Sequence, residues 1–277
     1  MTNTTEKTST HKAGGKEGTA LVTGASAGLG KIYADRLAGR GYDLILVARR
    51  EDRLEALAEE LRGRYGVNIA TIMADLANSG DLDKVAKTLS TSETITMLVN
   101  NAGTSTLGSL GDTPLANVDS MTDVNITALV RLSLAALPAF KRRGRGTIIN
   151  LGSILSFHTL PHSSAYSGTK GYVMNFTRGL QQEVAETNVR VQLVLPAATA
   201  TDIWELSGVP LDRLDPTTVM DPEACVDAAL AGLDQGELIT LPSLEDIELF
   251  NEYDAARLKL LSATQRSAPA TRYTVGK

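Results

Sequence analysis

The sequence has very few of the side chains from which disulfide frameworks and metal sites are built. Cys225 is the only cysteine, and the only histidines are His11, His158 and His162. One cysteine excludes a disulfide within the chain, and so few cysteines and histidines give no cluster typical of a metal site. We therefore expect no bound metal, and we interpret Cys225 as a small, semi-buried residue of a late helix.

Long apolar runs and basic stretches are also missing. No apolar run approaches the roughly 20 residues that span a bilayer, and the polar first 17 residues lack the hydrophobic stretch of a secretory signal. The net charge of −5 argues against the basic surface that binds nucleic acid or anionic lipid. We expect a cytoplasmic protein without nucleic-acid or membrane partners, and we interpret residues 1–17 as a disordered leader.

Short apolar runs do alternate with helical patterns along most of the chain. Runs that are apolar throughout are typical of strands in a parallel sheet covered on both faces, and the gaps suit helical crossovers. The sequence therefore predicts a single-domain α/β fold, a Rossmann-type doubly wound parallel sheet of seven strands flanked by helices. The predicted strands are Ala20–Thr23, Leu44–Ala48, Ile69–Met73, Met97–Asn100, Thr147–Leu151, Val191–Leu195 and Leu238–Leu241.

The alternation of strands and helices also indicates the extent of the domain, a tail and a lid. The dinucleotide-binding and catalytic domain is expected over residues 18–265, and residues 266–277 are expected to form a C-terminal tail. Residues 201–222 contain three prolines and break the alternation. Because a long insertion of this kind is typical of a mobile segment over an active site, we expect a lid there.

A glycine-rich turn follows the first predicted strand and opens the first helix, Thr23-Gly24-Ala25-Ser26-Ala27-Gly28-Leu29-Gly30. Glycines allow the backbone to turn sharply and to approach a pyrophosphate, and a helix N-terminus attracts the anion. The spacing is Gly-x3-Gly-x-Gly, not Gly-x-Gly-x2-Gly. Taken alone, this motif leaves a purely structural turn as an alternative.

Three later motifs stand in a fixed order after this turn. Asn100-Asn101-Ala102-Gly103 ends the fourth strand, Ser153 follows the fifth, and Tyr166-Ser167-Gly168-Thr169-Lys170 opens a helix. With these motifs the chain resembles the classical short-chain dehydrogenase/reductase family, in its NADP-preferring subgroup, from about Gly18 to Leu241. The resemblance implies hydride transfer between a nicotinamide cofactor, NADP(H), and a small carbonyl or alcohol substrate.

The end of the second strand bears on the choice of cofactor. An acidic residue there binds the ribose 2′-hydroxyl of NAD, whereas this chain has Ala48 followed by Arg49 and Arg50. A charge-assisted bond of about 1.5–3 kcal/mol to a 2′-phosphate corresponds to roughly 10- to 100-fold preference. We expect Arg49 to bind the phosphate and Arg50 to lie beside the adenine. Two alternatives remain, that the arginines only cap a helix and that Glu51 and Asp52 pair with them.

The resemblance implies further cofactor contacts at several places along the chain. Asp75 would bind the adenine or, alternatively, cap the next helix, and Asn101 would also tie strands together. Ala197 stands where the family has glycine, and Thr199 where an aliphatic residue is usual. The expected cofactor-binding residues are Gly24, Ser26, Ala27, Gly28, Leu29, Gly30, Arg49, Arg50, Asp75, Leu76, Asn101, Ala102, Gly103, Tyr166, Lys170, Pro196, Ala197, Thr199 and Thr201.

Tyr166 and Lys170 are four residues apart on a predicted helix, so both side chains leave one face. A tyrosine with a pKa of about 10 is a weak acid–base group near neutrality, and lowering the pKa to about 7 needs roughly 4 kcal/mol. An ammonium about 4 Å away supplies approximately that at an effective dielectric near 20. We therefore expect Lys170 to activate Tyr166. The resemblance adds Ser153, which binds the substrate oxygen, and Asn125, which holds a water of the proton relay.

The substrate end is expected to be mostly apolar. Besides Ser153, we expect Leu155, His158 and Trp204 to contact a ketone or alcohol of limited polarity. An NAD-preferring alcohol or sugar dehydrogenase and a non-catalytic dinucleotide-binding regulator remain alternatives. The long helices expected around Asp119–Phe140 and Ala165–Glu186 carry apolar positions, and the resemblance implies that they pair in a homotetramer or homodimer.

Overall fold

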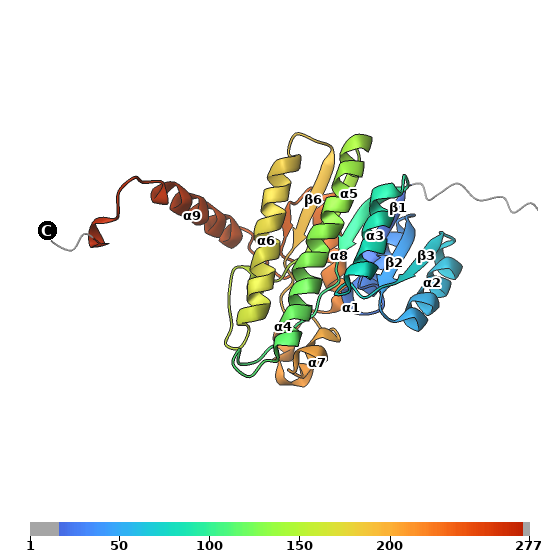
Figure 1. Ribbon diagram of the computed structural model, residues 1–277, viewed down its shortest axis with the longest axis horizontal. Helices are drawn as coiled ribbons and strands as arrows, with labels where there is room; N and C mark the ends of the chain where they lie inside the picture. Colours follow the sequence, from blue (N-terminus) through green and yellow to red (C-terminus); the bar gives the residue numbers. More distant parts are fainter. Residues whose placement is uncertain (1–16, 274–277) are drawn as a thin grey trace, which may run out of the picture. The chain divides into compact units, whose positions relative to one another are not determined.

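The structure is a computed structural model that describes residues 17–273 (Figure 1). It divides into two compact units, one up to Pro242 and one from Ser243 onward. The sheet, all the motifs and the cleft described below belong to the first unit. The leader predicted over residues 1–17 lies, but for its last residue, outside the described residues, as does the end of the predicted tail.

One parallel sheet of seven strands forms the centre of the first unit, and this confirms the predicted fold class. The order across the sheet is β3-β2-β1-β4-β5-β6-β7, and every neighbouring pair is parallel. The strands are β1 Thr19–Thr23, β2 Asp43–Ala48, β3 Ile69–Met73, β4 Ile95–Asn100, β5 Gly146–Leu151, β6 Val189–Val194 and β7 Ile239–Thr240.

The strand positions agree with the predicted runs, and the differences are at their ends. β6 begins at Val189 because it pairs with β5 from Gly146 onward, and that pairing includes the polar residues Arg190 and Gln192. β7 has only two residues because it lies at the edge and pairs with β6 alone. Pairing with a neighbour, not hydrophobicity along the chain, therefore decides where these strands start and stop.

Two layers of helices cover the sheet. α1 (Gly28–Gly39), α2 (Glu51–Tyr65) and α8 (Pro222–Asp234) pack with Ala20, Leu44 and other strand residues in one apolar core. α3 (Ser79–Thr91), α5 (Leu129–Arg143) and α6 (Ser164–Val184) share a second core with Leu21 and Leu98 (Figure 1). The strands β1, β2, β4 and β5 are thus buried on both faces, which is the pattern that the sequence predicted.

The helix between β4 and β5 is continuous over Leu115–Arg143 but changes its winding. It consists of α4 (Leu115–Thr122), a π-helical segment over Asp123–Ala128 and α5. By length and composition, these 29 residues are long and apolar enough to cross a membrane. The statement that no apolar run approaches the length of a membrane span is therefore wrong for this helix. The 44% burial of its most apolar window is the pattern of a helix packed on a sheet, and α5 contributes Leu132, Ala136 and Phe140 to the core.

The second unit contains α9 (Glu248–Thr264), a helix without a buried residue. The rings of Phe250 and Tyr253 contact each other with centroids 5.8 Å apart. Arg257 pairs with Asp254 one turn before it. The helix lies within residues 18–265, the span expected for the catalytic domain, but belongs to the second compact unit.

Candidate active site

The carboxyl ends of the parallel strands open into one cleft of about 620 Å³. β1 and β4 are neighbours in the sheet, and the connections leaving them run in opposite directions, so a crevice forms between them. All but three of the predicted site residues line this cleft. The three that do not are Gly30, Asn125 and His158.

The glycine-rich turn is built so that the backbone itself forms the floor of the cleft. Gly24 has a φ of +68°, a value that only glycine adopts without strain. A Cβ on Gly30 would lie 2.3 Å from the Gly24 carbonyl oxygen, so Gly30 is required for close packing beneath the turn. The Asn101 amide donates to the carbonyl of Thr23 at 2.9 Å, which ties β4 to β1 as the sequence suggested.

The start of α1 fits a phosphate group. Its N-cap residue, Ala27, provides no side-chain hydrogen bond, and the first turn contains no acidic residue. The first backbone N–H groups of the helix are therefore left for another acceptor, which an anion at the positive end of the helix dipole supplies. Together with the glycines, this geometry fits the pyrophosphate of a dinucleotide.

The two arginines after β2 lie on the rim of the cleft with exposed side chains. Arg50 donates to the Ser26 hydroxyl in the glycine-rich turn, at 3.2 and 3.3 Å. Within residues 17–273, neither arginine forms an ion pair with Glu51 or Asp52, which instead begin α2. Glu51 and Asp52 therefore do not compete with a phosphate for these arginines, which was the alternative that the sequence left open.

Asp75 also lines the cleft and follows β3, the strand that pairs with β2. Its carboxylate accepts from the backbone N–H of Ala77, and its own N–H donates to the Asp81 carboxylate. The N-cap of α3 is Asn78, whose side chain accepts from the N–H of Asp81. The alternative of Asp75 as the helix cap is thus wrong, and Asp75 shapes the turn that precedes the helix.

Ser153, Tyr166 and Lys170 come together where the ends of β5 and α6 meet. The Lys170 ammonium donates to the carbonyl of Leu151 at 2.9 Å and lies 5.8 Å from the centre of the Tyr166 ring. Both side chains leave the first turns of α6 on the side that faces the cleft. The Ser153 hydroxyl accepts from the N–H of Leu155 at 3.1 Å, which fixes its direction.

Burial determines how this group titrates in the protein alone. It raises the pKa of Tyr166 to about 12, although a hydrogen bond with Ser153 opposes the rise. It lowers the pKa of Lys170 to about 8. The expectation that Lys170 brings the pKa of Tyr166 down is wrong for this structure, because desolvation of the phenolate is the dominant effect and raises that pKa. Near neutrality Tyr166 therefore carries its proton.

Asn125 lies outside the cleft, in the π-helical segment. Its amide accepts from the N–H of Thr104 and donates to the Thr104 carbonyl, both at 2.9 Å. It also donates to the hydroxyl of Thr169, the residue before Lys170. These bonds hold the start of the connection that follows β4 against α6, close to Gly103. Asn125 is buried within this π-helical winding, which often marks functional positions.

A second buried amide network, which the sequence analysis did not predict, lies at the ends of β4 and β5. Asn100 donates to Asn150 at 2.9 Å and to Ser133 at 3.1 Å, and Asn150 donates to Thr177 at 3.0 Å. The bonds join β4, β5, α5 and α6. An asparagine at the end of each of two otherwise apolar strands was the signal that could have revealed it.

The segment after β6 departs from the family pattern without strain. Among the described residues other than glycine, only His162 has a positive φ, so Ala197 needs no glycine in its place. Thr199 pairs with Met220 in an isolated parallel bridge. The side chain of Thr201 reaches the start of α1, where it would meet a Cβ on Gly28 at 3.4 Å. Both threonines line the cleft as expected.

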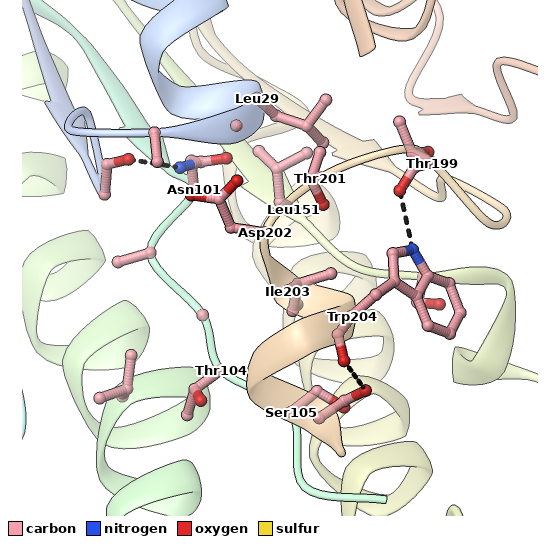
Figure 2. Close-up of a pocket in the computed structure, with 18 of the residues that line it drawn as sticks. Leu29, Asn101, Thr104, Ser105, Leu151, Thr199, Thr201, Asp202, Ile203 and Trp204 are labelled. Carbon is pink, nitrogen blue, oxygen red and sulfur yellow. Dashed lines mark hydrogen bonds between the residues drawn. The ribbon is translucent and has the colours of Figure 1, made fainter. Parts of the chain in front are cut away.

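At the substrate end the structure corrects one prediction and adds residues. Leu155 and Trp204 line the cleft, but His158 is exposed and lies away from it. The chain ends a short 3-10 helix at Ser156 and then turns toward solvent before returning to the cleft at Leu160. Residues that line the cleft and were not singled out for substrate contact are Leu107, Ser120, Val124, Leu160, Ile203, Glu205 and Ser207 (Figure 2 shows Ile203 beside Trp204).

Comparison with known proteins agrees with this geometry. The family model for short chain dehydrogenases matches residues 18–208. The chain belongs to the short-chain dehydrogenase family. A short-chain dehydrogenase from Sphingobium yanoikuyae, solved in complex with NADPH, has a TM-score of 0.90 and 40% identity, covering 92% of this chain and 99% of that one. The bulky-bulky ketone specific alcohol dehydrogenase from Comamonas testosteroni has a TM-score of 0.86 and 38% identity, covering 93% and 99%.

Curated relatives of the chain are named for another kind of substrate. The very-long-chain 3-oxoacyl-CoA reductase-A of Danio rerio is 35% identical over 201 residues, which make up 71% of this chain and 63% of that protein. The corresponding reductase of Anas platyrhynchos is 33% identical, with 65% of its length covered. The chain thus spans less than two thirds of the length of these two relatives.

Proposed function

We propose that the protein is an NADPH-dependent oxidoreductase that interconverts bulky, uncharged ketones or aldehydes and their alcohols. The observation that carries the proposal is the convergence of Ser153, Tyr166 and Lys170 at one end of a cleft whose other end has a backbone cradle for a dinucleotide. The solved neighbours that contain NADPH or act on ketones support it.

A bound nicotinamide would supply the hydride, and the chain's own residues would bind and protonate the substrate oxygen. The Ser153 hydroxyl donates to that oxygen and stabilises the negative charge that it gains. The Tyr166 phenol, protonated near neutrality because burial raises its pKa to about 12, then gives its proton to the oxygen. The Lys170 ammonium stabilises the phenolate that remains, and its bond to the Leu151 carbonyl keeps it in place.

The preference for NADPH rests on the rim after β2. Ala48 leaves no carboxylate to repel a 2′-phosphate, and Arg49 has no ion-pair partner among residues 17–273. Arg50 is already directed toward the glycine-rich turn by its bonds to Ser26. A free, exposed guanidinium beside the cleft suits a phosphate better than a ribose hydroxyl.

The proposed substrate is apolar and uncharged because of the residues that surround the ketone end. The stretches 104–107, 154–160 and 203–207 supply leucine, isoleucine and tryptophan to the cleft but no lysine or arginine. Glu205 adds a carboxylate. An acyl-CoA thioester carries several phosphates, and this lining offers them no positive charge.

Measured rates of NADPH oxidation with a panel of substrates test the proposal. The panel contains bulky aryl ketones, their carboxylate analogues and a 3-oxoacyl-CoA, each with NADPH and with NADH. We expect kcat/KM for the neutral ketones to exceed that for the thioester by at least about tenfold. A preference for the thioester would overturn the substrate class, and an absence of hydride transfer with every substrate would overturn the enzyme assignment.

We also propose that two copies associate through α5 and α6. Leu134 on α5 and Tyr172 on α6 expose 64% and 46% of their surfaces, and exposed apolar residues of this size often mark an interface. A monomer in light scattering at micromolar concentration would contradict this assembly.

A further inference from the structure

The loop between β6 and α8 has its two ends fastened together. Met220 donates its N–H to the Ala198 carbonyl at 2.8 Å, and Ala200 donates to the Met220 carbonyl at 3.0 Å. The short helix α7 (Ile203–Ser207) lies within this closed loop and lines the cleft. Because the ends of the loop are joined to each other, the position of α7 over the cleft depends on contacts made by α7 itself.

Two hydrogen bonds fasten α7, one near each end. At its C-terminal end, the carbonyl of the buried Ser207 accepts from the N–H of Leu107, at 3.1 Å. At its N-terminal end, the Trp204 indole N–H donates to the carbonyl of Thr199 at 2.8 Å (Figure 2). The first bond joins backbone groups only. The second depends on one side chain, which is also the only tryptophan of the chain.

The indole contacts the segment after β6. In the proposed function, this segment lies beside the nicotinamide. Thr199 and Trp204 both line the cleft, between the glycine-rich turn and the ketone end. A carbonyl oxygen accepts two hydrogen bonds, so the indole uses one lone pair of the Thr199 oxygen and leaves the other for a second donor. A bond of 2.8 Å within a partly buried contact fixes the orientation of the Thr199 peptide.

We propose that Trp204 is a positioning residue for hydride transfer. Its indole N–H orients the Thr199 carbonyl and keeps the first turn of α7 closed, so that the nicotinamide and the ketone stay aligned with Tyr166. This inference rests on the proposed reductase function. Since correct alignment acts on the transition state, its loss lowers kcat more than the affinity for cofactor.

Two variants separate the hydrogen bond from simple packing. Trp204→Phe retains an aromatic ring without the donor, whereas Trp204→His loses ring area but has Nε2 at the same position in the five-membered ring as the indole N–H. We expect kcat to fall roughly three- to tenfold in Trp204→Phe and to recover in Trp204→His. Packing alone predicts the reverse order, because histidine buries less apolar area than phenylalanine. Leu211→Ala, in the same loop but away from the cleft, serves as the control with unchanged kcat.

Two binding measurements do not depend on turnover. Calorimetry should give an affinity of Trp204→Phe for NADP⁺ within about twofold of the wild type. Excitation of the single tryptophan of the wild type should show a change in emission when NADP⁺ saturates the protein. Unchanged emission at saturation, unchanged kcat in Trp204→Phe, or a lower kcat in Trp204→His than in Trp204→Phe would overturn the role of the indole. A wild type that binds NADP⁺ with the emission change but reduces no ketone would instead overturn the proposed function.

Discussion

The two ends of the cleft are built in different ways. At the cofactor end, the strands themselves end in the glycine-rich turn, and Thr23 and Asn101 bond β1 and β4 directly to each other. At the ketone end, three connections meet through single backbone bonds, Leu107 to Ser207 and Gly108 to His162. A sheet positions the first end and loops position the second, so substrate choice can vary while the cofactor site keeps its form.

The largest expected effect lies at the junction of the two ends. Tyr166→Phe removes the proton donor and leaves the ring, so kcat for ketone reduction should fall by roughly 10²- to 10⁴-fold. Affinity for NADP⁺, measured by calorimetry, should stay close to that of the wild type. Near-full activity of this variant would show that another group protonates the substrate and would remove the basis of the mechanism.

At the cofactor end, the two rim arginines should differ. Arg49→Ala should lower kcat/KM with NADPH by roughly 10- to 100-fold and leave the value with NADH nearly unchanged. Arg50→Ala is the matched variant, and a smaller loss is expected because the Arg50 guanidinium is already bonded to Ser26. Equal losses of kcat/KM with both cofactors would mean that Arg49 supports the fold and does not bind the 2′-phosphate.

The pH profile tests which group limits the reaction. Lys170, with its pKa lowered to about 8, is charged below that pH and loses its charge above it, whereas Tyr166 retains its proton up to about 12. The kcat/KM for reduction should therefore be flat below neutrality and fall by about tenfold per pH unit above 8. Lys170→Arg remains charged throughout this range, so any activity that it retains should not show this fall.

The smallest effects are expected at the ketone end. Leu160→Ala should raise the KM for a bulky ketone only about two- to fivefold, because Leu160 lines the cleft with a half-exposed side chain. His158→Ala, two residues earlier and outside the cleft, should change neither KM nor kcat. A large loss in His158→Ala would mean that the loop carries this histidine into the site during turnover.

The sequence predicted the cofactor end far better than the ketone end. The glycine-rich turn, Asn101 and the Tyr166–Lys170 pair lie at strand ends or helix starts, where position along the chain translates directly into position in space. His158 was placed in the pocket because it follows Ser153 closely. Inside a loop, distance along the sequence is a poor guide to position in space. The chain turns after Ser156, so that His158 points to solvent and Leu160 lines the cleft.

The sequence by itself determined the class of fold, the cradle for a dinucleotide and the choice of Tyr166 and Lys170 as the proposed catalytic pair, because each depends on local patterns of apolar, glycine and polar residues. Only the tertiary structure decided the protonation of that pair, the bonds of Asn125 and the hydrogen bond between the Trp204 indole and the Thr199 carbonyl. Burial and hydrogen bonding at these positions come from segments distant along the chain. Burial of the Tyr166 side chain raises its pKa, and no spacing of residues encodes that desolvation.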